Sequence, residues 1–117
     1  MDSPVVGVAA ALKALETSLL DQSMALTDAV VGAQKSKDTA SARWSQLKAQ
    51  LEALQLANPG EQSAESKTLI RQIDDAKGVY DNAIATVNSY NKLYAVNSQQ
   101  LTRVQSEIDA MRGALLA

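Results

Sequence analysis

The sequence predicts an all-α fold, a long antiparallel two-helix coiled-coil hairpin that is completed by oligomerisation and forms a single domain over residues 1–117. One helix-breaking cluster, NPG, divides the chain into two arms of nearly equal length. Apolar residues recur along both arms at alternating spacings of three and four, which is the coiled-coil signature. The apolar residues are mainly Ala, Leu and Val, with no Phe, one Trp and three Tyr, and this favours closely packed helices over a compact globular core.

The first arm is predicted over about residues 4–57. It has a good helix start, because Ser3 can cap the helix and Pro4 suits its first position. Its apolar stripe falls into two registers, which join between Gln22 and Val30 through two consecutive steps of four. Such a stutter is expected to unwind the supercoil locally.

The turn is predicted at residues 58–63, and the second arm over about residues 64–116. Ser63 is placed to cap the second arm, and Glu65 brings a negative charge to the first turn, where the helix dipole favours one. The heptad spacing of this arm is unbroken. The core of the turn is formed by Asn58, Pro59 and Gly60.

Folding at the turn is expected to bring the two arms together along one intramolecular seam. In this pairing Trp44 meets Tyr80 and Leu51 meets Ile73, so rings and aliphatic side chains fill successive layers. The predicted seam residues are Leu12, Leu15, Leu19, Leu26, Val30, Trp44, Leu47, Leu51, Leu54, Leu69, Ile73, Tyr80, Val87, Tyr90, Tyr94, Leu101, Val104, Ile108, Met111 and Leu115.

Three polar residues fall on the seam and need a separate explanation. Asn97 is expected opposite Leu26 and next to Gln22, where the register of the first arm shifts. Either the two amides satisfy each other and fix the register of the hairpin, or Asn97 faces a neighbouring subunit. Lys37 is expected to lay its aliphatic stem along the seam while its ammonium group reaches water.

The composition argues against catalysis and against bound metals or cofactors. The chain has no Cys and no His, which removes the thiolate and imidazole groups that most metal and acid–base sites use. Asp74 and Asp75 are neighbours on a helix and point about 100° apart, so they cannot work as an acid–base pair. There is also no glycine-rich phosphate loop. The sequence therefore predicts a protein that is not an enzyme and has no cofactor.

The charge pattern and the apolar runs limit the kinds of partner. A net charge of −2 with mixed signs disfavours nucleic acid. The longest apolar run, residues 5–12, is too short to span a bilayer. It follows Asp2 rather than a basic region, so we expect no cleavable signal peptide.

The apolar residues outside the seam predict further association. A two-helix hairpin buries only one stripe, so flanking residues such as Leu93 and Val96 suggest that additional helices are needed. The apolar termini either close the open end of the coiled coil or form the inner wall of an oligomer or filament.

The segment YNKLYAVNSQQLTRVQSEIDA, together with the NPG turn, carries a resemblance to a known family. It has two tyrosines, a stretch rich in Ser, Asn and Gln, a basic residue before a valine, and an acidic residue before an apolar–Asp pair. It resembles the helical-hairpin subunits of type III secretion systems, namely the needle, the inner rod and the coiled coil of tip and sheath-filament proteins. The matching residues are Tyr90, Leu93, Tyr94, Arg103, Val104, Glu107, Ile108, Asp109 and Ala110.

This resemblance implies a structural subunit of an extracellular secretion filament or needle, secreted without a cleavable signal peptide. Its partners would be further copies of itself, together with other secretion components or a chaperone. Asn97 would then fix the register between subunits rather than within one hairpin. The residues implied to face a lumen are Gln99, Gln100, Arg103 and Glu107.

The alternative is a cytoplasmic coiled-coil adaptor or secretion chaperone, whose flanking apolar residues bind a partner helix in a closed small oligomer. In that case Asn97 would be an ordinary register device. An assembly that keeps growing with concentration favours the filament, whereas a fixed small oligomer favours the adaptor.

Overall fold

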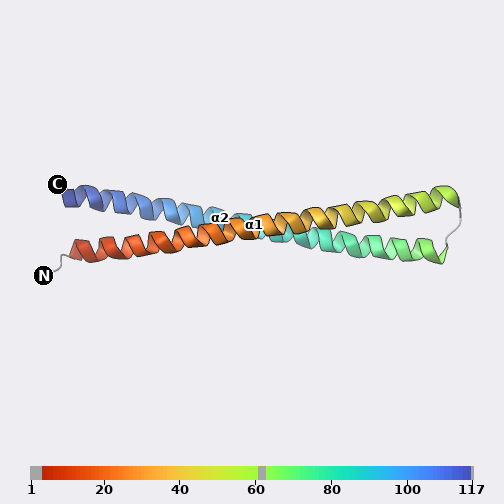
Figure 1. The fold of residues 1–117 in the computed structure, drawn as a ribbon, viewed down its shortest axis with the longest axis horizontal. Helices are drawn as coiled ribbons and strands as arrows, with labels where there is room; N and C mark the ends of the chain where they lie inside the picture. The colour runs from red at the N-terminus through yellow and green to blue at the C-terminus, as the bar shows by residue number, and fades with distance from the viewer. Residues whose placement is uncertain (1–3, 61–62, 117) are drawn as a thin grey trace. The chain divides into compact units, whose positions relative to one another are not determined.

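The computed structural model describes the backbone of residues 4–60 and 63–116 and the side chains of residues 6–60 and 63–114. In these ranges the chain forms two helices and no strand. Helix α1 spans Pro4–Ala57 and helix α2 spans Ala64–Leu116, and the two run antiparallel (Figure 1). The predicted fold class, an all-α antiparallel helical hairpin, is confirmed. Its completion by oligomerisation stays a prediction.

Helix α1 ends where the local chemistry requires it. The Asn58 N–H still donates to the Leu54 carbonyl at 3.0 Å, as in a continuing helix. Pro59 then disfavours the helical conformation of the residue before it and has no N–H of its own. Gly60 has φ of +82°, a left-handed conformation that glycine adopts without steric cost. The three residues therefore stop α1 and begin the turn.

Helix α2 begins with a serine cap. The Ser63 hydroxyl oxygen accepts a hydrogen bond from the Ser66 N–H at 3.1 Å, and the Ser63 carbonyl accepts one from the Lys67 N–H at 3.1 Å. Glu65 lies in the first turn. The side-chain bond satisfies one of the backbone donors that have no partner at a helix start, and the carboxylate complements the helix dipole.

Replacing Ser63 with alanine is expected to lower the free energy of unfolding by about 1 kcal/mol, because the Ser66 N–H loses its cap. Urea titration followed by circular dichroism, at one low protein concentration, measures this. Ser106→Ala is the matched control, since Ser106 is exposed in the body of α2. Equal costs for the two variants would contradict a capping role.

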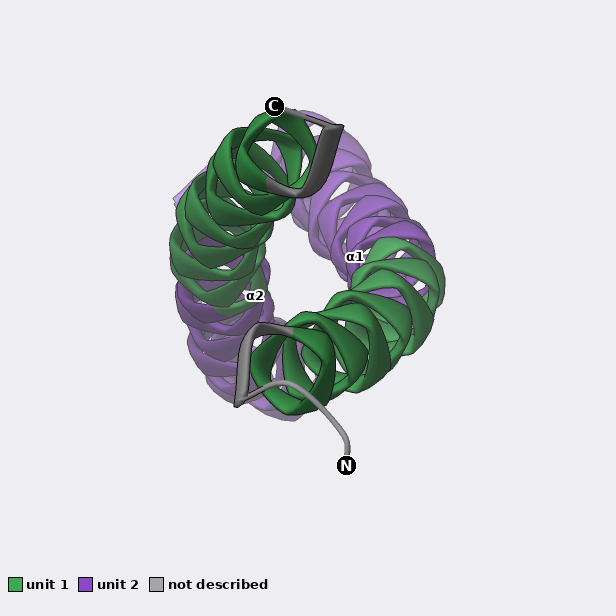
Figure 2. Cartoon of the chain, turned by 90° about the vertical axis from the view of Figure 1, so that its left-hand side faces the viewer, with its two compact units in different colours: residues 1–29, 90–117 green, residues 30–89 purple. Residues whose placement is uncertain are grey.

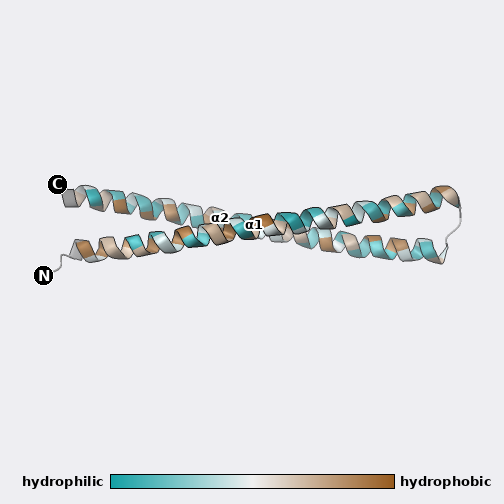
Figure 3. Ribbon diagram, in the orientation of Figure 1, coloured by the Kyte–Doolittle hydropathy of each residue, from teal (hydrophilic) through white to brown (hydrophobic). Residues whose placement is uncertain are grey.

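The contacts within the chain divide it into two compact units. Unit 1 consists of residues 1–29 and 90–117, and unit 2 consists of residues 30–89 (Figure 2). Each unit therefore contains one segment of α1 and one segment of α2. Apolar residues recur along both helices instead of gathering in one block (Figure 3), as expected where each helix buries a stripe.

Unit 2 packs around small side chains. Its buried apolar residues include three alanines, and small residues at a helix interface let the two backbones approach closely. They are Ala33, Ala40, Leu47, Ala76 and Val87.

An aromatic stack lies in the same unit. The rings of Trp44 and Tyr80, which the sequence places opposite one another, have centroids 5.6 Å apart and an interplanar angle of 24°. The Lys48 Nζ lies 3.7 Å from the Trp44 ring centroid, on a ring face that attracts cations. Such a stack adds about 0.5–1.5 kcal/mol beyond the area it buries.

Unit 1 has a thinner core. The apolar residues Leu19 and Val104 are each 5% exposed, and the third buried residue is polar, Asn97 at 4%. No large side chain among the described residues is completely buried. Unit 1 therefore gains less from apolar burial than its length would allow.

The register of α1 in unit 1 differs from the prediction. Leu15 is 47% exposed and Val8 51%, whereas Glu16 and Ser23 are half-buried in their place. The least exposed positions keep alternating by three and four through this segment, so the predicted stutter is wrong. With an uninterrupted heptad, the same side of α1 faces α2 along the whole segment. A stutter would have required the supercoil to unwind locally. Glu16, near the seam, pairs with the exposed Lys13 at 3.2 Å.

Candidate association surface

The structure places most of the predicted seam residues at low or intermediate exposure. Leu19, Leu47, Val87 and Val104 are buried. Two predicted seam residues are exposed, Leu15 at 47% and Tyr94 at 40%, so they lie at most at the edge of the seam. The side chain of Leu115 lies outside the described residues. The half-buried seam residues are Leu12, Leu26, Val30, Trp44, Leu51, Leu54, Leu69, Ile73, Tyr80, Tyr90, Leu101, Ile108 and Met111.

Asn97 is the polar residue in the core of unit 1. Its Nδ2 donates to the Leu19 backbone carbonyl at 3.0 Å, a bond that joins α2 to α1. Its Oδ1 is buried and has no hydrogen-bond partner. Gln22 is exposed, so the predicted mutual satisfaction of Asn97 and Gln22 is wrong. The amide reaches a backbone carbonyl instead, because Leu19 lies on the stripe that faces α2 and Gln22 does not.

Asn97 also lines a shallow hollow between the two helices of unit 1. Two large apolar residues of α2 border it, Leu93 at 54% exposure and Val96 at 51%. Its complete lining is Gln22, Ala25, Leu26, Leu93, Val96, Asn97 and Gln100. The hollow is therefore an open apolar depression with amides at its edge and one buried amide among its lining residues.

The side of α1 that borders the hollow stays uncharged and largely apolar toward the N-terminus. Val8 and Leu15 precede Gln22 by whole heptads, so on a coiled coil they follow the flank on which the hollow opens. We call the set Val8, Leu15, Gln22, Ala25, Leu93 and Val96 the Asn97 surface. None of its members is charged.

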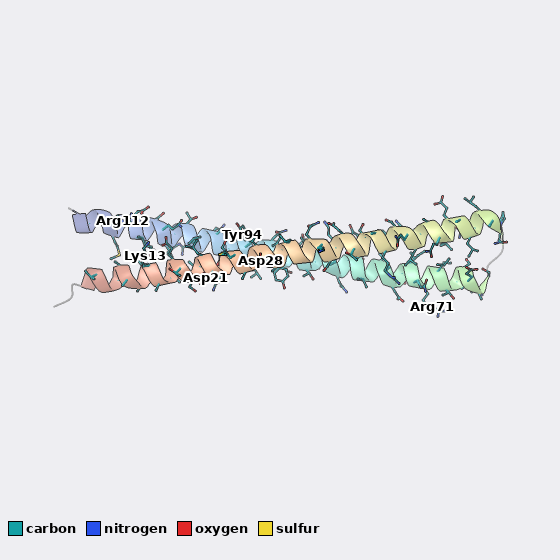
Figure 4. All side chains as sticks on the ribbon, viewed as in Figure 1. Lys13, Asp21, Asp28, Arg71, Tyr94 and Arg112 are labelled. Carbon is teal, nitrogen blue, oxygen red and sulfur yellow. The ribbon has the colours of Figure 1, made fainter. Side chains whose placement is uncertain are left out.

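The nearest acidic residues of α1 lie off this surface. Asp21 and Asp28 are seven residues apart and therefore share one face of α1 (Figure 4). Neither of them lines the hollow, and nor does Tyr94 of α2, which the same view labels. The hollow is therefore free of charge across its whole lining.

The remaining polar candidates differ in their exposure. Gln100 lines the hollow, whereas the other three implied lumen residues do not. Lys37 is half-buried in unit 2, where its stem can follow the seam. The predicted lumen residues Gln99, Gln100, Arg103 and Glu107 are exposed, and the turn residues Asn58, Pro59 and Gly60 are exposed as well.

Several described threonine side chains bond within their own helix. Thr17, Thr27 and Thr102 each donate their hydroxyl to the carbonyl four residues earlier in the same helix. In the part of the chain that the structure describes, no group of three acidic side chains could hold a metal ion. The described helices also contain no stretch that is long and apolar enough to cross a membrane.

The surface could have been recognised from the spacing of the residues beside the seam. The spacing of three and then four residues connects Leu93, Val96 and Gln100. These residues form a second stripe on α2 that runs beside the seam. Sequence reasoning identified Leu93 and Val96 as surplus apolar residues. It did not place them at one depression with Asn97, because that required the packing of both helices.

The fold and this surface define a class of protein, a two-helix coiled-coil hairpin whose unit 1 leaves an uncharged apolar side open. No family model matches the chain, and no curated protein and no solved structure is significantly similar to it.

Proposed function

We propose that this protein is a structural subunit of an extracellular secretion filament or needle that self-assembles through its helical arms. The observation that carries the proposal is the imbalance within unit 1. Among the described side chains, its buried apolar residues are Leu19 and Val104, yet it exposes twice as many large apolar or aromatic side chains as unit 2. Those exposed in unit 1 are Val6, Val8, Leu15, Leu20, Met24, Leu93, Tyr94 and Val96.

The physical reason is that one buried stripe stabilises a helix pair only marginally. Most helical stability in proteins comes from tertiary packing of the apolar face, and an isolated pair has little of it. Exposed apolar side chains gathered on one unit indicate a binding partner. Copies of the same hairpin supply such a partner without a second gene product.

The assignment to secretion rests on the resemblance of Tyr90–Ala110 and the NPG turn to type III secretion subunits. In this proposal the chain leaves the cell without a cleavable signal peptide, and a chaperone or other secretion components bind it before assembly. The role is structural, so it requires no catalytic residue, metal or cofactor.

A second function is favoured by the hollow at Asn97. A depression with an apolar lining between two helices is a suitable groove for an amphipathic helix of another protein. In that case the protein is a cytoplasmic adaptor or secretion chaperone and forms a closed small oligomer.

Concentration dependence separates these two functions. We expect the purified protein, concentrated and left for several days, to form fibres of constant width in negative-stain electron microscopy. Sedimentation velocity over a dilution series should show mass that keeps increasing with concentration. A fixed dimer or tetramer over the whole series would contradict the filament and support the adaptor.

A further inference from the structure

We propose that the Asn97 surface receives a second copy of the same chain, in a two-fold pair whose axis runs along the hairpin. This inference rests on the proposed self-association and names one contact of the assembly with its register. A two-fold pair is closed, so growth of a filament requires a second contact elsewhere on the chain. In such a pair the two copies lie parallel, and α1 of one copy packs antiparallel against α2 of the other.

The Asn97 surface carries no charge. On α1, the flank that opens on the hollow carries no charged residue between Val8 and Ala29. On α2, the flank is uncharged from Leu93 to Gln100, and beyond it Arg103 and Glu107 are four residues apart, where they can pair with each other on their own helix. Around the hollow, a partner with a charged face would find no countercharge, whereas a second copy brings an equally uncharged lining.

The sizes of the side chains around the hollow differ between the two helices. Leu93 and Val96 of α2 are each about half exposed, whereas α1 presents the small residue Ala25 there, with Ala29 one helical turn further on. The proposed two-fold axis places each α2 half against the α1 half of the other copy. Around the hollow, large side chains therefore meet small ones on both sides of the axis, as close helix packing requires.

The level of Asn97 along the hairpin sets the register of the pair. Because its Nδ2 bonds to the Leu19 carbonyl, Asn97 lies near the α1 turn that contains Leu19 and Gln22. Two parallel copies in register then bring Asn97 of each to the level of Gln22 of the other. The exposed Gln22 side chain of one copy therefore lies over the hollow that the buried Asn97 of the other copy lines.

Cysteine cross-linking tests this register, because the natural chain has no cysteine. We would prepare Ala25→Cys and Val96→Cys as separate chains, mix them above the assembly concentration and oxidise them. Both positions are exposed, and circular dichroism confirms that the variants fold. The mixture is expected to form disulfide-linked heterodimers, with each chain alone forming few, because the two sites meet only across the pair.

The matched control is a mixture of Met24→Cys with Ala95→Cys. These residues are exposed on the same helices, one position away from the test residues, and do not line the hollow. We expect roughly tenfold less cross-linking from this mixture, since no high effective concentration holds these sites together.

Three other results would overturn the inference. In one such result, Val96→Cys forms disulfide-linked homodimers while the mixture with Ala25→Cys forms no heterodimers. That result would indicate an antiparallel pair. A second result is that wild-type protein assembles in sedimentation but the test mixture cross-links no more than the control mixture. The proposed function would then stand, and the Asn97 surface would not be the contact. Wild-type protein that remains monomeric at every concentration would overturn the proposed function and this inference together.

Discussion

Replacing Asn97 with leucine is expected to stabilise the dilute hairpin by about 1–2 kcal/mol. The Asn97 side chain is 4% exposed and its Oδ1 has no partner, and an unsatisfied buried polar atom costs about 1–3 kcal/mol. Leucine loses the Nδ2 bond to the Leu19 carbonyl but removes the larger desolvation cost and adds apolar contact. Urea unfolding at a concentration below assembly measures the change, with Asn91→Leu as the exposed control in the same unit.

The same variant is expected to assemble less uniformly at high concentration. A buried asparagine in a coiled coil gives up stability but fixes register and oligomeric state. Without it, leucine packs acceptably in several registers, so sedimentation should show a broader distribution than the wild type. If Asn97→Leu instead destabilises the dilute hairpin while Asn91→Leu does not, the amide has a better set of partners in solution than the Leu19 carbonyl alone.

The hairpin could be predicted because its signals are local. Pro59 and Gly60 stop one helix, and Ser63 caps the next, through backbone geometry and hydrogen bonds that involve only neighbouring residues. The heptad spacing of α2 then specifies which stripe is buried. No long-range information is needed to infer two helices and a turn from such a sequence.

The register of α1 in unit 1 could not be derived in the same way. Leu12, Leu19 and Leu26 are seven residues apart and belong to both available registers, so they do not discriminate between them. The remaining choice lies between a flank that contains Val8 and Leu15 and one that contains Glu16 and Ser23. Apolar character favours the first flank, but the packed hairpin turns the second one inward.

The partner of Asn97 was also beyond sequence reasoning. Every residue has a backbone carbonyl, so a side chain that bonds to one leaves no signature in the composition of its target. Pairing Asn97 with Gln22 was chemically reasonable because both are amides, yet the donor found a closer acceptor on the facing stripe. Side-chain-to-backbone bonds of this kind appear only once the two helices are packed.

Substitution of Leu19 with alanine is expected to destabilise the hairpin by about 2–5 kcal/mol, the range for truncating a buried leucine. Leu20→Ala is the matched control, because it changes the same side chain at the next residue of the same helix. Leu19 is 5% exposed and Leu20 is 44% exposed, so the control is expected to cost less than about 1 kcal/mol. The helix propensity changes equally in both variants and cancels in the comparison.

Circular dichroism during urea titration of dilute protein measures both variants. Because Leu19 is one of two buried apolar residues among the described side chains of unit 1, its loss should appear as a large drop in helical signal before denaturant is added. Equal, small effects would show that the Leu19 stripe does not hold unit 1 together. Equal, large effects would show that Leu20 is covered in solution, and a second copy would then have to pack on the side of α1 that carries Leu20, away from the Asn97 surface.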